Sequence, residues 1–502
     1  MQIQASKPSP SSSADSFSDM TGQLRREEKS PDQSEGCRSG VLKAEVKNKL
    51  FGLECAASAS VPPTKNMTDF KISQIAAIPH DSEIRFAFFS PDSKHVFTAG
   101  CDDTVKIFSR NSDGNWVHTL MDSQSKDISS VEFSPDGRWL AVARYDHTVR
   151  VFARDAGGQW QHEQDITHSG STGRATFSPD GRYLLTADFQ NIKVHCIGAK
   201  HCWVEETNIS QTDIVPESEK ISWLNLNEGN PVFSPCGSRF VVRGSEHTVK
   251  VYARQDDGVW QQEAHINSHD KFIHAMFSPD GSELITTVWG DAARKVHFYA
   301  RNPEGDWMKQ HSIRYDRSLF TDSCGTPPEI SPDGNSIVMT NFSLFETSGV
   351  AMIHGRCPDG SWQEKCTIHH RGRIHAAAFS PDSSRVVAVG GDNRARICHR
   401  DAKGHWKEVA VIDHGDWVMS ACFSPDSNLL MTNAMHSGNT NATKIYGRTA
   451  DESWVHKATL SQRCRHRFSS AFSPDGSHAL TLSSPPPQEA VIWSVQRGKE
   501  RM

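Results

Sequence analysis

Histidine and aspartate recur along this chain at fixed places relative to a repeated turn. A histidine lies eight or nine residues before the phenylalanine of five FSP sequences, at His80, His168, His269, His370 and His414. An aspartate occupies the next turn at Asp102, Asp146 and Asp392. An imidazole beside a carboxylate can act as a general base or as a metal ligand. These pairs repeat along the chain instead of converging on one place, which favours a structural role over a catalytic or metal site.

Other chemistry-bearing motifs are missing from the sequence. It contains no GxSxG, HExxH, GxxxxGK or GxGxxG motif. Its twelve cysteines are scattered without a CxxC pair, which fits reduced thiols in the cytosol better than a zinc site or a disulfide scaffold. We therefore expect no catalytic residue, no metal and no cofactor.

The turn that marks these positions is the clearest element of the chain. It occurs nine times, beginning at residues 89, 133, 177, 233, 277, 330, 379, 423 and 472, and four of the eight intervals are 44 residues. A period of about 40–50 residues indicates a repeat architecture. The second copy predicts strands at 128–133, 138–143 and 148–154 and a fourth strand from Trp160. Such a four-stranded sheet exposes both faces, so it is stable only when stacked against neighbours.

These units resemble WD40-repeat β-propellers over residues 69–497. The likeness rests on a first strand ending in FSPDG, an Asp turn and a third strand of the TVKIF type; most units lack the family's Trp-Asp ending, and only Trp493 holds that Trp position. In the family, the His and Asp residues join a hydrogen-bond network buried within the blade. The resemblance implies that structural role for His80 with Asp102 and for His370 with Asp392.

The resulting fold class is all-β, a propeller of four-stranded antiparallel blades, with nine blades in one ring. Eight of the fourth strands open at a Trp, and residues 71–78 would supply the ninth by pairing with 490–495. This overlap of the two ends closes the ring without a free edge. Two separate rings, or one degenerate unit, remain alternatives, because the units at 203–233 and 307–351 are the least regular.

An arginine precedes a tryptophan by six residues in seven of the units. The pairs are Arg110/Trp116, Arg154/Trp160, Arg254/Trp260, Arg301/Trp307, Arg356/Trp362, Arg400/Trp406 and Arg448/Trp454. At this spacing the two residues face each other across a hairpin, where a cation–π contact contributes about 0.5–1 kcal/mol. We interpret pairs such as Arg154 and Trp160 as structural staples at the outer rim; a collective aromatic binding rim is the alternative.

The two ends of the chain differ from the repeats. Residues 1–68 are rich in Ser and Pro and are expected to be a disordered tail that serves in export or docking, and 498–502 form a short tail. No apolar run is long enough for a membrane span, and we expect a cytoplasmic protein. A Ser-rich start without an acidic residue before Asp15 also resembles the export region of bacterial type III effectors, so secretion into a host cell is the alternative; a regulatory tail phosphorylated at Ser-Pro sites is another.

Charge and loop composition suggest the partner. The net charge of −6 argues against nucleic acid. The loops expected on one face hold large or basic residues, among them Arg85, Arg144, Arg174, Arg243, Trp289, Arg373 and Trp417. We expect a monomeric, non-enzymatic scaffold that binds proteins or peptides, including acidic or phosphorylated ones. The alternatives are a type III effector acting on host proteins through the propeller and a propeller enzyme with its active site at the channel mouth.

Overall fold

The computed structural model describes most of the chain after residue 69. The described ranges are 70–102, 104–122, 128–188, 190–198, 202–210, 231–243, 247–290, 293–314, 327–343, 348–435, 441–462, 470–483 and 488–497. The expected tails, 1–68 and 498–502, lie outside them. All regular structure in these ranges is β-strand, and no helical segment there has the length and hydrophobicity needed to cross a bilayer.

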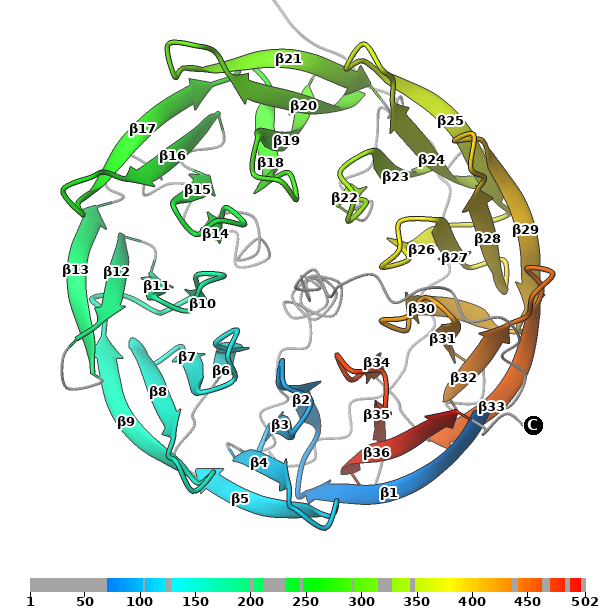
Figure 1. The fold of residues 1–502 in the computed structure, drawn as a ribbon, viewed down its shortest axis with the longest axis horizontal. Coiled ribbons are helices and arrows are strands. Elements are labelled where there is room, and N and C mark those ends of the chain that lie inside the picture. The colour runs from blue at the N-terminus through cyan, green and yellow to red at the C-terminus, as the bar shows by residue number, and fades with distance from the viewer. Residues whose placement is uncertain are drawn as a thin grey trace, which may run out of the picture. The chain divides into compact units, whose positions relative to one another are not determined.

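Thirty-six strands form nine four-stranded antiparallel sheets arranged as blades around a central axis (Figure 1). We label the strands of a blade A to D from the axis outwards. Blades 1 to 9 begin with β2, β6, β10, β14, β18, β22, β26, β30 and β34. The predicted nine-bladed ring is therefore confirmed.

Each strand position has its own sequence signature, as the bounds of the strands show. The A strands end at the Phe or Ile of the repeated turn: β2 (Ile84–Phe89), β6 (Ile128–Phe133), β10 (Arg174–Phe177), β14 (Val232–Phe233), β18 (Lys271–Phe277), β22 (Glu329–Ile330), β26 (Ile374–Phe379), β30 (Trp417–Phe423) and β34 (Ser470–Phe472). The B strands are β3 (His95–Gly100), β7 (Trp139–Arg144), β11 (Tyr183–Ala187), β15 (Arg239–Arg243), β19 (Glu283–Gly290), β23 (Ser336–Ser343), β27 (Arg385–Gly390), β31 (Leu429–Met435) and β35 (His478–Ser483). The C strands are β4 (Val105–Arg110), β8 (Thr148–Arg154), β12 (Asn191–Ile197), β16 (Thr248–Arg254), β20 (Ala293–Arg301), β24 (Ser348–Arg356), β28 (Arg394–Arg400), β32 (Asn441–Arg448) and β36 (Gln488–Arg497). Eight of the nine D strands open at Trp: β5 (Trp116–Asp122), β9 (Trp160–Thr167), β13 (Trp203–Ser210), β17 (Trp260–Asn267), β21 (Trp307–Arg314), β25 (Trp362–His370), β29 (Trp406–Asp413) and β33 (Trp454–Gln462). The ninth D strand is β1 (Phe70–His80), in blade 9.

The SPDG turn closes each A–B hairpin with its own hydrogen bonds. In blade 2, the Gly137 N–H donates to the Ser134 carbonyl at 2.8 Å, and Gly137 takes the left-handed φ of 66° that glycine favours. The Ser134 hydroxyl accepts the Trp139 N–H at 2.9 Å and donates to Asp136 at 2.5 Å. Asp136 accepts the Arg138 N–H at 3.0 Å. Because each residue type satisfies a different backbone or side-chain group, closely similar sequences recur at the nine turns.

Three of these turns carry serine where the others carry glycine, and each serine keeps a left-handed φ of 59° or 60°. Such a backbone costs a non-glycine residue about 1–2 kcal/mol. In each case the serine hydroxyl accepts the N–H of the turn aspartate in the preceding blade: Asp475 to Ser93 at 3.0 Å, Asp333 to Ser383 at 3.0 Å and Asp382 to Ser427 at 3.1 Å. The added bond between blades offsets part of the backbone cost.

The hydrophobic core of the described residues is divided among the seams between blades. Its nine clusters of buried residues each draw on two adjacent blades. Between blades 1 and 2, for example, Phe97 and Ile107 pack with Leu140 and Phe152. Every residue of β7 is buried, although alternate side chains point to opposite faces of the sheet. A blade is therefore covered only when both neighbours are present.

Strand β1 closes the ring. It pairs antiparallel with β36 from Phe70 opposite Arg497 to His80 opposite Gln488. The blue strand β1 and the red strand β36 therefore lie side by side in Figure 1. This confirms the prediction that residues 71–78 complete the last blade. The two units expected to be least regular also form complete blades, although their A strands, β14 and β22, have only two residues each.

The Arg–Trp pairs face each other across the C–D hairpins, but most of the arginines also form ion pairs with the preceding blade. All seven arginines lie opposite their tryptophans in the ladders. Among the described pairs the guanidinium lies over the indole ring only at Arg356 and Arg400. Arg154 instead bonds Asp92 of blade 1 at 3.1 Å, and its partner Trp160 is buried with its ring 5.6 Å from that of His95, also in blade 1. At Arg154 and Trp160, the staple expected within one hairpin is therefore corrected to a clamp across the seam to blade 1.

The closing strand should contribute to stability through the side chain that enters the seam. Ile78 is fully buried between blades 9 and 1, whereas Ile75 on the same strand is 43% exposed. Ile78→Ala should lower the free energy of unfolding by about 2–5 kcal/mol, and the matched Ile75→Ala should change it by less than about 0.5 kcal/mol. Denaturant midpoints of the full chain measure both. Equal effects of the two substitutions would contradict the closure.

Candidate functional site

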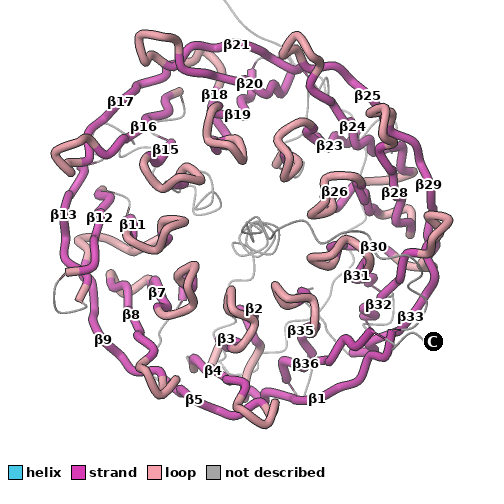
Figure 2. The backbone as a smooth tube through the Cα atoms, in the orientation of Figure 1, coloured by secondary structure: helices cyan, strands magenta, loops and turns pink. Residues whose placement is uncertain are grey.

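The ring presents two faces of different construction. One, the turn face, carries the A–B turns and C–D hairpins and is the side seen in Figure 2. The other, the loop face, carries the D–A and B–C connections, such as 168–173 and 145–147 in blades 2 and 3. The seven predicted binding residues lie at strand ends or connections of the loop face: Arg85, Arg144, Arg174, Arg243, Trp289, Arg373 and Trp417.

A histidine–aspartate pair joins blades 6 and 7 at the loop face. The side chain of His370 is fully buried, and its Nδ1 lies 2.8 Å from Asp392 Oδ1. The second carboxylate oxygen accepts the Arg371 N–H at 3.1 Å. A Cβ at Gly390 would lie 2.8 Å from the Arg373 carbonyl oxygen and 3.2 Å from the His370 ring, which explains the glycine. The pair thus ties the D–A loop to the B–C loop.

The corresponding pair at the seam between blades 9 and 1 belongs to a slightly longer network. His80 Nε2 lies 2.8 Å from the Thr98 hydroxyl, and its Nδ1 lies 3.4 Å from Asp102 Oδ2. The Thr104 hydroxyl donates to Asp102 at 2.6 Å and lies 3.2 Å from His80 Nδ1. Burial lowers the pKa of both His80 and His370, so both imidazoles are neutral at pH 7.

A third pair, His168 with Asp188, was missed by the sequence reasoning. Both side chains are fully buried, with His168 Nδ1 3.5 Å from Asp188 Oδ2. Burial alone would raise the pKa of Asp188, but hydrogen bonds from His168 and from backbone N–H groups hold it below its usual range. Asp188 lies 11 residues after its turn Phe, whereas Asp102 and Asp392 lie 13 after theirs. A shorter B–C loop therefore hid the partner; allowing for that deletion would have found it.

These pairs link neighbouring blades, so the expected network within one blade is corrected to a network across a seam. His80, His168 and His370 lie at the ends of the D strands of blades 9, 2 and 6, and their aspartates lie in the B–C loops of blades 1, 3 and 7. Within the described ranges, no group of three or more His, Cys, Asp and Glu side chains is placed to hold a metal ion. What the pairs can do is to hold the loop face in a fixed shape, because each links the end of a D strand to the end of a B strand.

An exposed tryptophan and an exposed arginine lie on the loop face of blades 7 and 8. Trp417, the first residue of β30, is 57% exposed. The His375 ring lies 6.3 Å from the Trp417 ring, and His375 Nδ1 is 2.9 Å from the Val418 carbonyl oxygen. Arg373 is exposed just before β26, where a bulge at His375 interrupts the ladder. We call Arg373, His375 and Trp417 the blade 7–8 cluster.

A second cluster joins blades 4 and 5. Arg294 lies over the ring of Trp289 at 5.8 Å, and Trp289 is 38% exposed. Arg243 donates to the Phe272 carbonyl at 3.0 Å. Burial, followed by the positive charges of Arg243 and Arg294, lowers the pKa of His274 to about 4. We call Arg243, His274, Trp289 and Arg294 the blade 4–5 cluster; its two arginines supply the charge, because His274 is neutral at pH 7.

The remaining predicted arginines are less available. Arg85 is half-buried and donates to Cys101 Sγ at 3.1 Å, and Arg174 is half-buried. The prediction that Arg144 belongs to the binding surface is wrong, because Arg144 is only 6% exposed and its guanidinium pairs with Asp146 of the same loop. Its carbonyl also accepts the Thr172 hydroxyl of blade 3. An arginine at this depth belongs to the packing of the seam, not to a binding surface.

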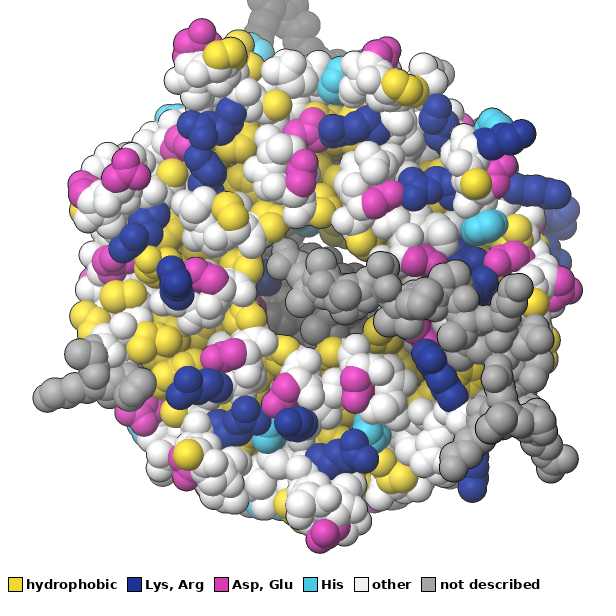
Figure 3. Space-filling view, in the orientation of Figure 1, with side chains coloured by type: hydrophobic (Ala, Val, Ile, Leu, Met, Phe, Trp, Pro, Cys, Tyr) yellow, Lys and Arg dark blue, Asp and Glu magenta, His cyan; other side chains and the backbone are white. Residues whose placement is uncertain are grey.

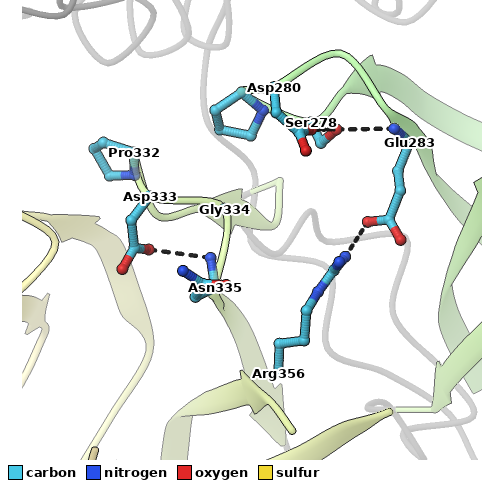
Figure 4. Close-up of a pocket in the computed structure, with 9 residues that line it drawn as sticks. Ser278, Asp280, Glu283, Pro332, Asp333, Gly334, Asn335 and Arg356 are labelled. Atoms are coloured by element: carbon cyan, nitrogen blue, oxygen red, sulfur yellow. Dashed lines mark hydrogen bonds and ion pairs between the residues drawn. The ribbon is translucent and has the colours of Figure 1, made fainter. Parts of the chain in front are cut away.

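A pocket of about 220 Å³ lies on the turn face between blades 5 and 6 (Figure 4). Arg356 pairs with Glu283 there, and the Ser278 hydroxyl accepts the Glu283 N–H at 2.9 Å. Its polar groups bond to one another within and between adjacent turns, so we assign the pocket to seam packing. Figure 3 shows Lys and Arg interspersed with Asp and Glu around this face.

The fold defines this protein as a β-propeller, and the repeats can be named more closely. The family model described as "WD domain, G-beta repeat" matches residues 73–109, 114–152, 362–399 and 406–439. The protein is thus a nine-bladed β-propeller in which four stretches match the WD40 repeat. Each matched stretch takes in a D strand and continues into the following blade, so one sequence repeat spans two blades. A search of curated proteins finds no match by sequence.

Solved structures share this fold at low sequence identity. A crystal structure of the eukaryotic initiation factor is 16% identical, covers 82% of this chain and 96% of its own, and has a TM-score of 0.55. The Dos1 propeller is 13% identical, with coverages of 84% and 95% and a TM-score of 0.47. A periplasmic gluconolactonase of Pseudomonas aeruginosa is 15% identical, with coverages of 68% and 96% and a TM-score of 0.40.

Removing the carboxylate of blade 7 should destabilise the ring. Asp392→Ala leaves the buried His370 Nδ1 and the Arg371 N–H without their acceptor, which should cost about 1–3 kcal/mol of unfolding free energy. The control is Asp256→Ala, at an exposed aspartate in a C–D hairpin, with an expected change below about 0.5 kcal/mol. Denaturant unfolding measures both, and an unaffected Asp392→Ala variant would show that the pair does not hold the loops.

Buried histidines should make the ring sensitive to mild acid. Burial lowers the pKa of His95, His195, His274, His297 and His414 to about 4. Because these groups have a pKa near 6.5 when unfolded, the unfolded chain binds more protons between pH 6.5 and 4. Stability should be full above pH 6.5 and fall as the pH drops toward 4. Denaturant midpoints between pH 7.5 and 5 test this; midpoints independent of pH would contradict it.

Proposed function

We propose that this protein is a non-enzymatic interaction scaffold whose loop face binds acidic or phosphorylated segments of partner proteins. WD40 propellers are typically protein-interaction scaffolds. The observation that carries the proposal is the blade 7–8 cluster, in which the exposed Arg373 lies on the same face as Trp417, the most exposed large hydrophobic residue described. The blade 4–5 cluster repeats the combination of arginine and exposed tryptophan.

The charge arrangement supports an acidic ligand. Asp392, on the loop next to Arg373, already accepts hydrogen bonds from His370 and from the Arg371 backbone. A carboxylate or phosphate of a partner would gain charge-assisted hydrogen bonds from an arginine guanidinium, which are roughly twice as strong as neutral ones. Exposed tryptophan supplies apolar contact area and is enriched among the residues that dominate binding energy.

The histidines support a scaffold in preference to an enzyme. The paired histidines that could have served as general bases are buried, and each is bonded to an aspartate of the following blade. Burial lowers the pKa of His80 and His370. The alternative is an enzyme with its active site at the channel mouth. If this alternative is correct, the protein turns over a substrate. That turnover should be lost when loop-face histidines such as His274 and His375 are replaced and the fold is retained.

Oligomeric state and location complete the proposal. We propose a monomer, because the ring closes within one chain through β1 and β36, and a cytoplasmic location, as the scattered single cysteines indicate. The alternative is an effector exported by a type III system. Fusing residues 1–65 to a reporter and measuring type III-dependent export distinguishes these two locations.

Binding should depend on the blade 7–8 cluster. After partners are identified by pull-down and mass spectrometry, Trp417→Ala should weaken binding of an acidic partner peptide by about 2 kcal/mol, or roughly 30-fold. Arg373→Glu should weaken it further and reduce its salt dependence. Isothermal titration calorimetry at two salt concentrations measures both effects.

Matched controls lie away from the loop face. Met308→Ala removes a side chain that is 52% exposed on a D strand. Arg182→Glu reverses the charge of a residue on an A–B turn, and the Arg182 side chain is 79% exposed. Neither should change affinity. If these controls weaken binding as much as the cluster variants, or if the cluster variants bind normally, the loop face is not the partner surface.

A further inference from the structure

Two cysteines meet at the seam between blades 6 and 7. Cys366 lies on the outer strand β25 of blade 6, and Cys398 lies on β28 of blade 7; their sulfur atoms are 3.9 Å apart. Cys398 is 1% exposed, whereas Cys366 is half-buried on the outermost strand. One thiol of the pair is thus reachable from solvent, and the other is shielded directly behind it.

Comparison among the blades shows that this contact is particular to one seam. Cys398 follows the C–D register shift, at the position that is aromatic in six other blades: Phe108, Phe152, Tyr252, Tyr299, Tyr446 and Trp493. In those seams the D strand of the preceding blade packs on a ring, as Leu120 and Phe152 do between blades 1 and 2. At the seam between blades 6 and 7, each blade instead contributes a thiol, Cys366 from blade 6 and Cys398 from blade 7.

We propose that Cys366 and Cys398 form a reversible disulfide across the blade 6–7 seam by exchange with a low-molecular-weight disulfide. A disulfide requires the sulfurs to close from 3.9 Å to about 2.05 Å, a movement that side-chain rotation and small shifts of the seam can supply. The modification site is independent of the proposed partner surface.

The electrostatics assign different roles to the two sulfurs. The hydrogen bond from the Cys398 thiol lowers the pKa of Cys366 to about 7. The same bond, together with burial, raises the pKa of Cys398. Cys366 is therefore the attacking thiolate, and Cys398 keeps the proton until the second step.

The exchange proceeds in two balanced steps. The Cys366 thiolate attacks one sulfur of the small disulfide, forms a mixed disulfide and expels a thiolate, which takes up a proton. Cys398 then loses its proton to water and attacks Cys366 Sγ, which releases the second small thiol. Two protein thiols are oxidised and one small disulfide is reduced to two thiols. The product links the outer strand of blade 6 to blade 7, and a thiol reductant reverses it.

The test exposes the full chain to glutathione disulfide, blocks the remaining thiols and maps peptides by mass spectrometry. The wild type should yield a linked peptide containing Cys366 and Cys398. Cys398→Ser should instead accumulate the glutathione mixed disulfide at Cys366, and Cys366→Ser should leave the buried Cys398 unmodified. The cross-linked wild type should also melt at a higher temperature than its reduced form, with no such rise in Cys398→Ser.

Cys236 is the internal control, because it is exposed on an A–B turn, where its thiol lies within hydrogen-bonding distance of the Ser234 and Ser238 hydroxyls. It should form only a mixed disulfide. The proposal is overturned if Cys366 stays reduced under conditions that modify Cys236, or if the wild type accumulates the mixed disulfide at Cys366 without the cross-link.

Discussion

The structure depends on one constraint: each four-stranded blade exposes two hydrophobic faces, and only its two neighbours can cover them. The nine core clusters of the described residues accordingly lie at the nine seams. A linear stack would leave two uncovered faces, and a closed ring leaves none. Closure in turn requires that β1, at the beginning of the repeats in the sequence, pair with β36, at their end.

Polar groups reinforce the same seams and thereby shape the surfaces. On the turn face, Arg154 reaches Asp92 and Ser93 accepts the Asp475 N–H, each across a seam. On the loop face, the His–Asp pairs link the D strand of one blade to the B–C loop of the following blade. Both faces are thus braced by contacts between blades, and the loop face also presents Arg373 and Trp417 to solvent. These exposed side chains are the physical reason to look for partners at the loop face.

Repetition made most of the fold predictable, because whatever acts within one blade appears nine times in the sequence. The turns, the strand order, the Arg–Trp register and the closing strand all follow from it. The acceptors that the arginines reach across the seams leave no such periodic trace, because they differ from seam to seam: Asp92, Glu206 or Glu263. The burial of Arg144 and the pairing of His168 with Asp188 depend on a neighbouring loop or on loop length, which a motif at one position does not encode. Only part of the predicted binding face therefore remains as a surface.

Closure of one ring by its own N-terminal strand is the central claim, and a designed cross-link tests it most directly. Ser73 and Ser494 face each other in the β1–β36 ladder with their hydroxyl oxygens 3.0 Å apart. The double variant Ser73→Cys and Ser494→Cys, oxidised and mapped by mass spectrometry under native conditions, should form a disulfide within a single chain of unchanged hydrodynamic size. Cysteines that remain reduced, or that link two copies of the chain, would contradict the account.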